Sequence, residues 1–102
     1  MSESFLIDAA TVAAGESCAV KAFQIPVAPM IDFRIACDQP FTVKFYVADA
    51  DFTDTADAAE LAGTAESRLA SAGIVYHIDA GSYDFAAAVV TNDGAAPATV
   101  TV

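Results

Sequence analysis

Residues 31–47 read IDFRIACDQPFTVKFYV, and apolar residues alternate with polar ones along two separate runs of this stretch. The break between the runs is Gln39-Pro40. Because successive side chains of a strand point to opposite faces, a period of two predicts two half-buried strands. Their apolar faces carry Ile31, Phe33, Ile35 and Cys37 in the first run, and Phe41, Val43, Phe45 and Val47 in the second.

A further strand is expected over residues 17–25, between the Ala14-Gly15 turn and the segment Pro26–Pro29. Proline cannot donate a ladder hydrogen bond, so this segment is read as a four-residue hairpin connection. If Ile25 faces Met30, the register places Cys18 opposite Cys37. The same register sets Lys21 opposite Arg34, a like-charge pair that counts against it.

The C-terminal half contains the remaining strand signals. Ile74, Tyr76 and Ile78 alternate and lead through Ala80-Gly81-Ser82 into residues 83–91, which predicts a second hairpin. Asn92-Asp93-Gly94 then turns the chain toward a last strand over residues 98–102. An early strand near Phe5–Asp8 is expected to pair at an edge or with the C-terminus.

The segment Asp49–Ala72 is the least strand-like part of the chain. Helix propensity favours a turn or two near Asp57–Ala62, and a short strand is expected near Ser67–Ser71. Short strands separated by frequent turn signals indicate one all-β domain over residues 1–102. The predicted fold is an antiparallel β-sandwich of jelly-roll or GOLD-like type, with about seven or eight strands and one long acidic loop.

Charge is the most unusual feature of the composition. Fourteen acidic residues stand against four basic ones, so the formal net charge is −10 and the pI is about 4.1. This balance excludes nucleic acid as a partner, because phosphate binding needs clustered Lys and Arg. The acidity is interpreted as a halophilic adaptation that keeps the surface hydrated, as a surface for cations or basic partners, or as ordinary drift.

The N-terminus lacks a basic region followed by a long apolar run, so no secretory signal is expected. No transmembrane segment is expected either, because no stretch approaches the roughly 18 apolar residues of a membrane span. A cytoplasmic location is the resulting expectation.

Acidic residues in the long loop form the sharpest candidate site. Calcium prefers several carboxylate oxygens that converge from a loop, which makes Asp49, Asp51, Asp54 and Asp57 candidate metal ligands, with Glu60 nearby. Their spacing does not match the EF-hand, which needs glycine at its sixth position, where Asp54 stands here. The alternative is a solvated acidic loop without a cation. No other cofactor is predicted.

Cys18 and Cys37 are interpreted as a candidate disulfide, as a redox pair, or as two small buried thiols; the last is commonest in a reducing compartment. His77 shares a strand face with Val75 and Asp79 and could titrate beside a carboxylate. No Ser or Cys lies in a recognisable nucleophile motif, so the chain is not expected to be an enzyme.

Tyr46 is the aromatic residue singled out as a candidate ligand contact. Alternation assigns most aromatic rings to the core, whereas Tyr46 points away from the face shared by Phe41 and Phe45. An exposed ring of this kind would suit carbohydrate binding, although the chain has no Trp.

Four stretches resemble GOLD (Golgi dynamics) domains, in particular small stand-alone prokaryotic versions of that β-sandwich. They are Val12–Glu16, Ile31–Ile35, Pro40–Val47 and Ile78–Phe85. The resemblance implies a sandwich used to bind proteins or ligands. Eukaryotic cargo receptors of this kind have a membrane span and a disulfide. Cys18 could match its first cysteine, but the second would fall near residues 86–88, which are alanines.

The function expected from these observations is a non-enzymatic binding or adaptor module that engages a protein partner through a sheet face or an edge strand. The alternative is a structural subunit of a homo-oligomer or particle, which would show itself as self-association. A calcium-binding or carbohydrate-binding module is the third interpretation.

Overall fold

The computed structural model describes residues 9–25, 30–61 and 64–102, and this part of the chain forms two antiparallel sheets. Sheet A has the strand order β1-β9-β3-β7. Its strands are β1 (Ala10–Val12), β9 (Ala98–Thr101), β3 (Met30–Cys37) and β7 (Ser71–Asp79). Sheet B has the order β2-β8-β4-β5, and β6 also pairs with β4. Its strands are β2 (Phe23–Gln24), β8 (Phe85–Asn92), β4 (Phe41–Ala48), β5 (Ala59–Glu60) and β6 (Glu66–Arg68).

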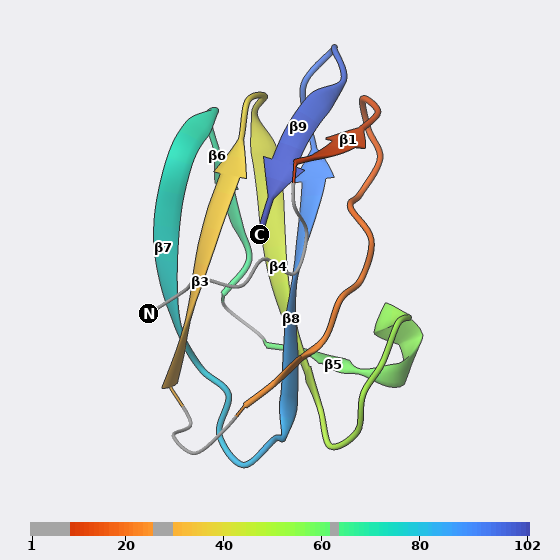
Figure 1. Cartoon of the computed structure of the whole chain (residues 1–102), viewed down its shortest axis with the longest axis vertical. Coiled ribbons are helices and arrows are strands. Elements are labelled where there is room, and N and C mark those ends of the chain that lie inside the picture. The colour runs from red at the N-terminus through yellow and green to blue at the C-terminus, as the bar shows by residue number, and fades with distance from the viewer. Residues whose placement is uncertain (1–8, 26–29, 62–63) are drawn as a thin grey trace.

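The two sheets face each other across one buried core to which both contribute, and Figure 1 shows β3 and β7 to the left of β4 and β8. The one helical element of the described residues is the short 3-10 turn η1 (Thr55–Asp57). No helix in the described part of the chain is long and apolar enough to cross a membrane.

β3 and β4 confirm the strands predicted from residues 31–47. On β4, Phe41, Val43, Phe45 and Val47 are buried, whereas Lys44 between them is exposed. On β3, Ile31, Phe33, Ile35 and Cys37 are buried in the same core. The alternation therefore places two apolar faces against each other, one from each sheet.

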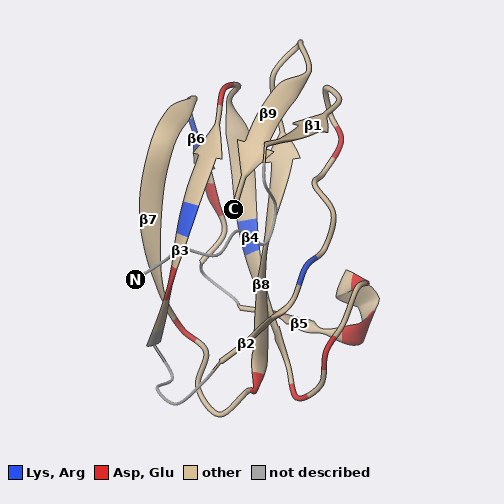
Figure 2. Cartoon of the chain, in the orientation of Figure 1, with Lys and Arg blue, Asp and Glu red and all other residues tan. Residues whose placement is uncertain are grey.

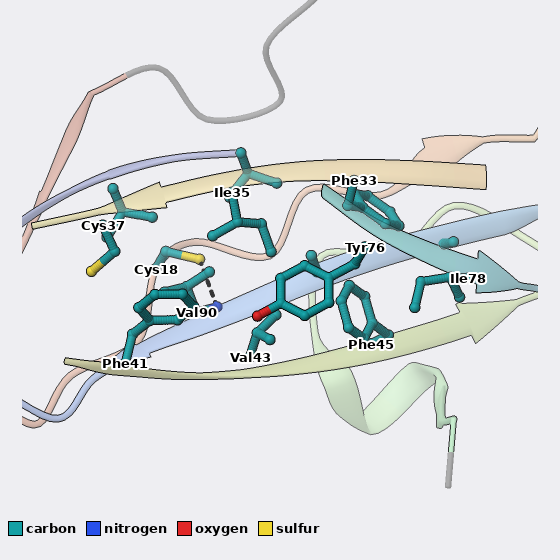
Figure 3. Packing of buried hydrophobic residues seen from close by; sticks show 14 of the residues in the cluster. Cys18, Phe33, Ile35, Cys37, Phe41, Val43, Phe45, Tyr76, Ile78 and Val90 are labelled. Carbon is teal, nitrogen blue, oxygen red and sulfur yellow. Dashed lines mark hydrogen bonds between the residues drawn. The ribbon is translucent and has the colours of Figure 1, made fainter. Parts of the chain in front are cut away.

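Aromatic rings fill the middle of this core. The ring of Phe45 on sheet B lies 5.6 Å from that of Phe33 and 5.3 Å from that of Tyr76, both on sheet A. Both rings are tilted relative to the ring of Phe45, and the separations between ring centroids are within the range of favourable aromatic pairs. Figure 3 shows Phe45 reaching across from β4 toward both rings. Beside Phe45 in sheet B, Ala86 and Ala88 of β8 also face this core, so the neighbouring side chains on that strand are small.

The predicted hairpin between residues 17–25 and β3 is wrong. Ser17 pairs with Thr91, the N–H of Cys18 donates to the carbonyl of Val90 at 2.9 Å, and Phe23 pairs with Ala86. This segment therefore runs beside β8 in sheet B, while β3 pairs with β7 and β9 in sheet A. Alternation identifies which face of a strand is buried, but it does not identify the strand that lies beside it. The assumed connection Pro26–Pro29 lies outside the described residues.

The second predicted hairpin is wrong for a similar reason. β7 belongs to sheet A and β8 to sheet B, so the turn between them crosses from one sheet to the other. Gly81 has a positive φ of 61° in this turn, and its N–H donates to Asp79 Oδ1 at 2.9 Å. Glycine adopts this backbone conformation without steric cost. The turn at residues 80–82 was therefore predicted correctly, but the pairing of the two strands that it joins was not.

The other local predictions are partly confirmed. β9 ends the described fold as the predicted last strand, and it pairs with both β1 and β3. The helical turn lies at Thr55–Asp57, ahead of its predicted place, and the residues after it form β5 instead. β6 ends at Arg68 rather than continuing to Ser71. The strand predicted near Phe5–Asp8 lies outside the described residues.

Asn92 is the one polar side chain buried among the core residues that the structure describes. Its Nδ2 donates to the carbonyls of Val12 at 3.0 Å and Ala96 at 2.8 Å. Its Oδ1 accepts the N–H of Gly94 at 2.9 Å. A buried amide is tolerated only when its donors and acceptor are satisfied, as they are here. This side chain therefore joins the end of β1 to the turn between β8 and β9.

Phe45→Ala tests the aromatic centre of the core. The truncation removes a side chain that is 1% exposed and leaves a cavity between the sheets, so we expect a loss of about 3–5 kcal/mol in the free energy of unfolding. Lys44→Ala, on the exposed side of the same strand, should change it by less than about 0.5 kcal/mol. Urea unfolding followed by circular dichroism measures both, and similar losses for the two variants would contradict the assignment of faces.

Candidate functional site

The acidic loop after β4 holds the residues predicted to bind calcium. Asp49, Asp51, Asp54 and Asp57 are all exposed, and Figure 2 shows acidic positions spread along the loop and over η1. Oδ1 of Asp54 accepts the N–H of Ala56 at 2.9 Å, so this carboxylate caps η1. Within the described ranges, no group of three or more His, Cys, Asp or Glu side chains is placed to hold a metal ion.

Two of the predicted ligands line one shallow hollow. Asp49 and Asp57 border a space of about 360 Å³ whose wall also includes Val47, Ala58 and Tyr83. Asp51 and Asp54 do not border it. The loop thus brings two carboxylates to a common hollow and leaves the other two elsewhere.

Phe52 explains why the acidic loop takes this path. Its side chain is 4% exposed and belongs to a second apolar cluster with Ala48 and Ala87. Ala87 alternates with the core residues Ala86 and Ala88, so this cluster lies on the outer face of sheet B. The loop folds back over the sheet to bury Phe52. An isolated Phe among acidic residues was the only sequence signal for this contact.

Tyr46 lies on the outer face of sheet B, as its phase in the alternation predicted. It is half-buried and packs against the Phe52 cluster, together with Phe85 and Ala58. Its neighbours in the sheet are Ala87 and Glu60. Part of the ring is therefore used for packing, and its role as a ligand contact stays a prediction.

His77 forms an ion pair or hydrogen bond with Asp32 on the outer face of sheet A. Nδ1 of His77 lies 2.6 Å from Oδ1 of Asp32, and the two side chains are 69% and 62% exposed. They stand directly opposite each other on β7 and β3. This contact holds the ring in place, but among the described residues no hydroxyl or thiol lies within hydrogen-bonding distance of His77.

Cys18 and Cys37 are both buried free thiols in this structure. The pKa of each thiol is raised, and burial is the main cause in both. Backbone N–H groups of Val90 and Gln39 counteract part of the increase, at Cys18 and Cys37 respectively. A raised pKa disfavours the reactive thiolate, so these thiols are protected while the fold is closed.

The hydroxyl of Tyr76 was missed by sequence analysis. It is buried and has no hydrogen-bond partner among the residues that the structure describes. Its pKa is raised by burial first and by the charge of Glu66, and is lowered in part by Arg68. Glu66 and Arg68 form an ion pair of 3.0 Å on β6 and border a shallow hollow beside the β6–β7 turn.

β7 forms one edge of sheet A, and it too was not singled out by sequence analysis. It pairs with β3 on one side, and in the part of the chain that the structure describes no strand pairs with its other side. Figure 2 shows β7 without Lys or Arg along its length. Its one acidic residue is Asp79, at its end. Val75 is 47% exposed on the outer face.

Comparison with protein-family models and with curated proteins finds no match for this sequence. A functional assignment therefore depends on the arrangement of the residues themselves.

Tyr76→Phe tests the unpartnered hydroxyl. Removing a buried polar group without a partner should raise the free energy of unfolding by about 1 kcal/mol at neutral pH. A raised folded-state pKa means that the folded protein disfavours the ionised phenolate. The wild-type protein should therefore keep its full stability below the unfolded pKa of about 10 and lose stability as the pH rises beyond it. The variant should lose that alkaline sensitivity. Tyr83→Phe, which is exposed, is the control; unfolding curves at neutral and alkaline pH measure both, and a destabilised Tyr76→Phe would contradict this view.

Melting temperatures in KCl and CaCl₂ at matched ionic strength separate salt adaptation from a calcium site. Screening of a net charge of −10 reduces self-repulsion, so we expect both salts to raise the melting temperature equally. A larger increase in CaCl₂ that disappears in the double variant Asp49→Asn, Asp57→Asn would instead establish a site at the hollow that these residues border.

Proposed function

We propose that this protein is a non-enzymatic binding module that engages a protein partner through the edge of β7 with which no described strand pairs. The observation that carries the proposal is this edge, which runs for nine residues from Ser71 to Asp79. An unpaired edge presents a row of backbone donors and acceptors that an added strand can satisfy.

The side chains of β7 favour strand addition rather than preventing it. Natural edges are commonly protected by lysine, proline or an inward-pointing charge, and β7 contains none of these. Tyr76 and Ile78 are buried in the core, which holds the strand in place. Outward-facing Val75 is exposed and offers an apolar contact beside the edge.

The chemistry of the partner follows from charge and backbone geometry. An extended segment with apolar side chains in alternate positions matches the pleat of β7. A net charge of −10 attracts basic residues near that segment and repels acidic ones. The proposed partner is therefore a protein that presents an extended, basic-flanked strand.

A structural subunit of a homo-oligomer is the second candidate, and the strand order is compatible with it. The chain crosses between sheets from β3 to β4, from β7 to β8 and again from β8 to β9. We interpret these crossings as a β-sandwich of jelly-roll type, an architecture shared by lectin and viral capsid domains. The proposed GOLD-like resemblance also implies a sandwich. Fold alone does not decide between an adaptor and a building block.

Light scattering of the purified protein in molar and in dilute KCl distinguishes the two candidates. The adaptor proposal expects a folded monomer in both solutions. A stable oligomer would favour the structural subunit instead.

Val75→Lys tests the use of β7 as the docking strand. The probe is a synthetic peptide of alternating valine and threonine with a lysine at each end, added to isotope-labelled protein. We expect chemical-shift changes in the amides of residues 71–79, and about tenfold weaker binding by Val75→Lys, which corresponds to about 1.4 kcal/mol. Thr99→Lys adds the same charge on β9, an inner strand of the same sheet, and should bind normally. Shifts centred on another strand, or equal weakening by both variants, would contradict the proposal.

A further inference from the structure

Cys18 and Cys37 reach the same part of the core from opposite sheets. Cys37 ends β3 in sheet A, where it pairs with Val100 and Ser71. Cys18 lies beside β8 of sheet B, and Val90 fixes it there through two hydrogen bonds. One joins the Cys18 N–H to the Val90 carbonyl at 2.9 Å, and the other joins the Val90 N–H to Sγ of Cys18 at 3.3 Å.

Two observations place the thiols in the same part of the core. Both belong to the same buried cluster, with exposed fractions of 6% for Cys18 and 1% for Cys37. Figure 3 shows both sulfur atoms at one end of the core, close to Phe41. Burial is the main cause of the raised pKa of Cys18, and the charge of a Cys37 thiolate adds a smaller contribution.

We propose that Cys18 and Cys37 are a dithiol pair that closes to a disulfide linking the two sheets. This proposal does not depend on the use of β7 as a docking strand. The pair agrees with the one considered from the sequence, but its position differs, because the two cysteines belong to opposite sheets rather than to the two strands of one hairpin. Closure requires the Cys18 side chain to turn away from the Val90 N–H that it now accepts.

The reaction proceeds by thiol–disulfide exchange with a small disulfide such as oxidised glutathione. The thiolate of Cys18 attacks one glutathione sulfur, which forms a mixed disulfide and releases one glutathione thiolate. The thiolate of Cys37 then attacks the protein sulfur and releases the second glutathione. The two protein thiols lose two protons and two electrons, and two molecules of reduced glutathione are formed.

Cys18 is the residue assigned to the first attack because its segment is held less firmly. Sheet contacts near it are the single bridge Ser17–Thr91 and the two residue pairs of β2 with β8. Cys37, in contrast, ends an eight-residue strand paired on both sides. Segments with few ladder contacts open locally at lower free-energy cost, so opening near β2 would expose the Cys18 thiol.

The experiment compares disulfide formation in folded and unfolded full-length protein. Reduced protein is refolded in a buffer of reduced and oxidised glutathione, and a matched sample is held in concentrated urea with the same buffer. Both are quenched with acid and analysed by mass spectrometry. Access does not limit the reaction, because both samples start unfolded.

We expect the internal disulfide to be at least about tenfold more favoured under folding conditions, since a cross-link that fits the fold is stabilised by it. The oxidised protein should melt about 10 °C higher than the reduced protein. Dithiothreitol should reverse the increase. Cys18→Ala and Cys37→Ala should melt at the same temperature with and without oxidant.

Three results would overturn the proposal. They are an internal disulfide that is no more favoured in folding buffer than in urea, a disulfide that joins two chains, and an oxidised protein that melts no higher than the reduced one. Because oxidised and reduced wild-type protein are compared directly, the outcome does not require either alanine variant to fold.

Discussion

The fold depends on the burial of two alternating apolar faces against each other, one from β3 and one from β4. These strands supply the aromatic contact between Phe33 and Phe45, and β7 adds Tyr76 to the same group of rings. Burial of apolar area is the main favourable contribution to folding, and rings bury the largest areas. Many of the other residues of the chain are alanines, which contribute little. The stability of the core is therefore concentrated in a few strands at its centre.

Sequence alternation was sufficient to predict where these strands lie but not which strands they pair with. The apolar face of residues 31–47 was identified correctly because a period of two fixes side-chain direction. Short connections were interpreted as hairpins, whereas the turn through Gly81 joins strands of different sheets. The residue types of a turn indicate its backbone angles, but they do not indicate whether the two flanking strands pair with each other or join different sheets. Pairing depends on contacts between distant segments, such as Ser17 with Thr91, which have no local signature.

The candidate sites were predictable to different degrees for similar reasons. Tyr46 lies on the outer face because its phase along β4 requires it. The acidic residues were identified as a group from composition, but their arrangement follows from Phe52, which draws the loop over sheet B. The place of β7 at the edge of the described part of sheet A is known only when the strand order is known. Charge counts and alternation describe each residue separately, whereas a binding surface is a property of neighbours.

The hydrogen bonds of Asn92 have a consequence for how the chain folds. Its amide joins Ala96, four residues away, to Val12, eighty residues away. A partly folded chain that forms β8 and β9 without the N-terminal segment would bury this amide with a missing acceptor, at a cost of about 1–3 kcal/mol. Intermediates of that kind are disfavoured relative to both the unfolded and the complete structure. A single side chain in this way couples the first and last strands into one cooperative transition, so that residues near Val12 act as an integral part of the domain rather than as an appendage.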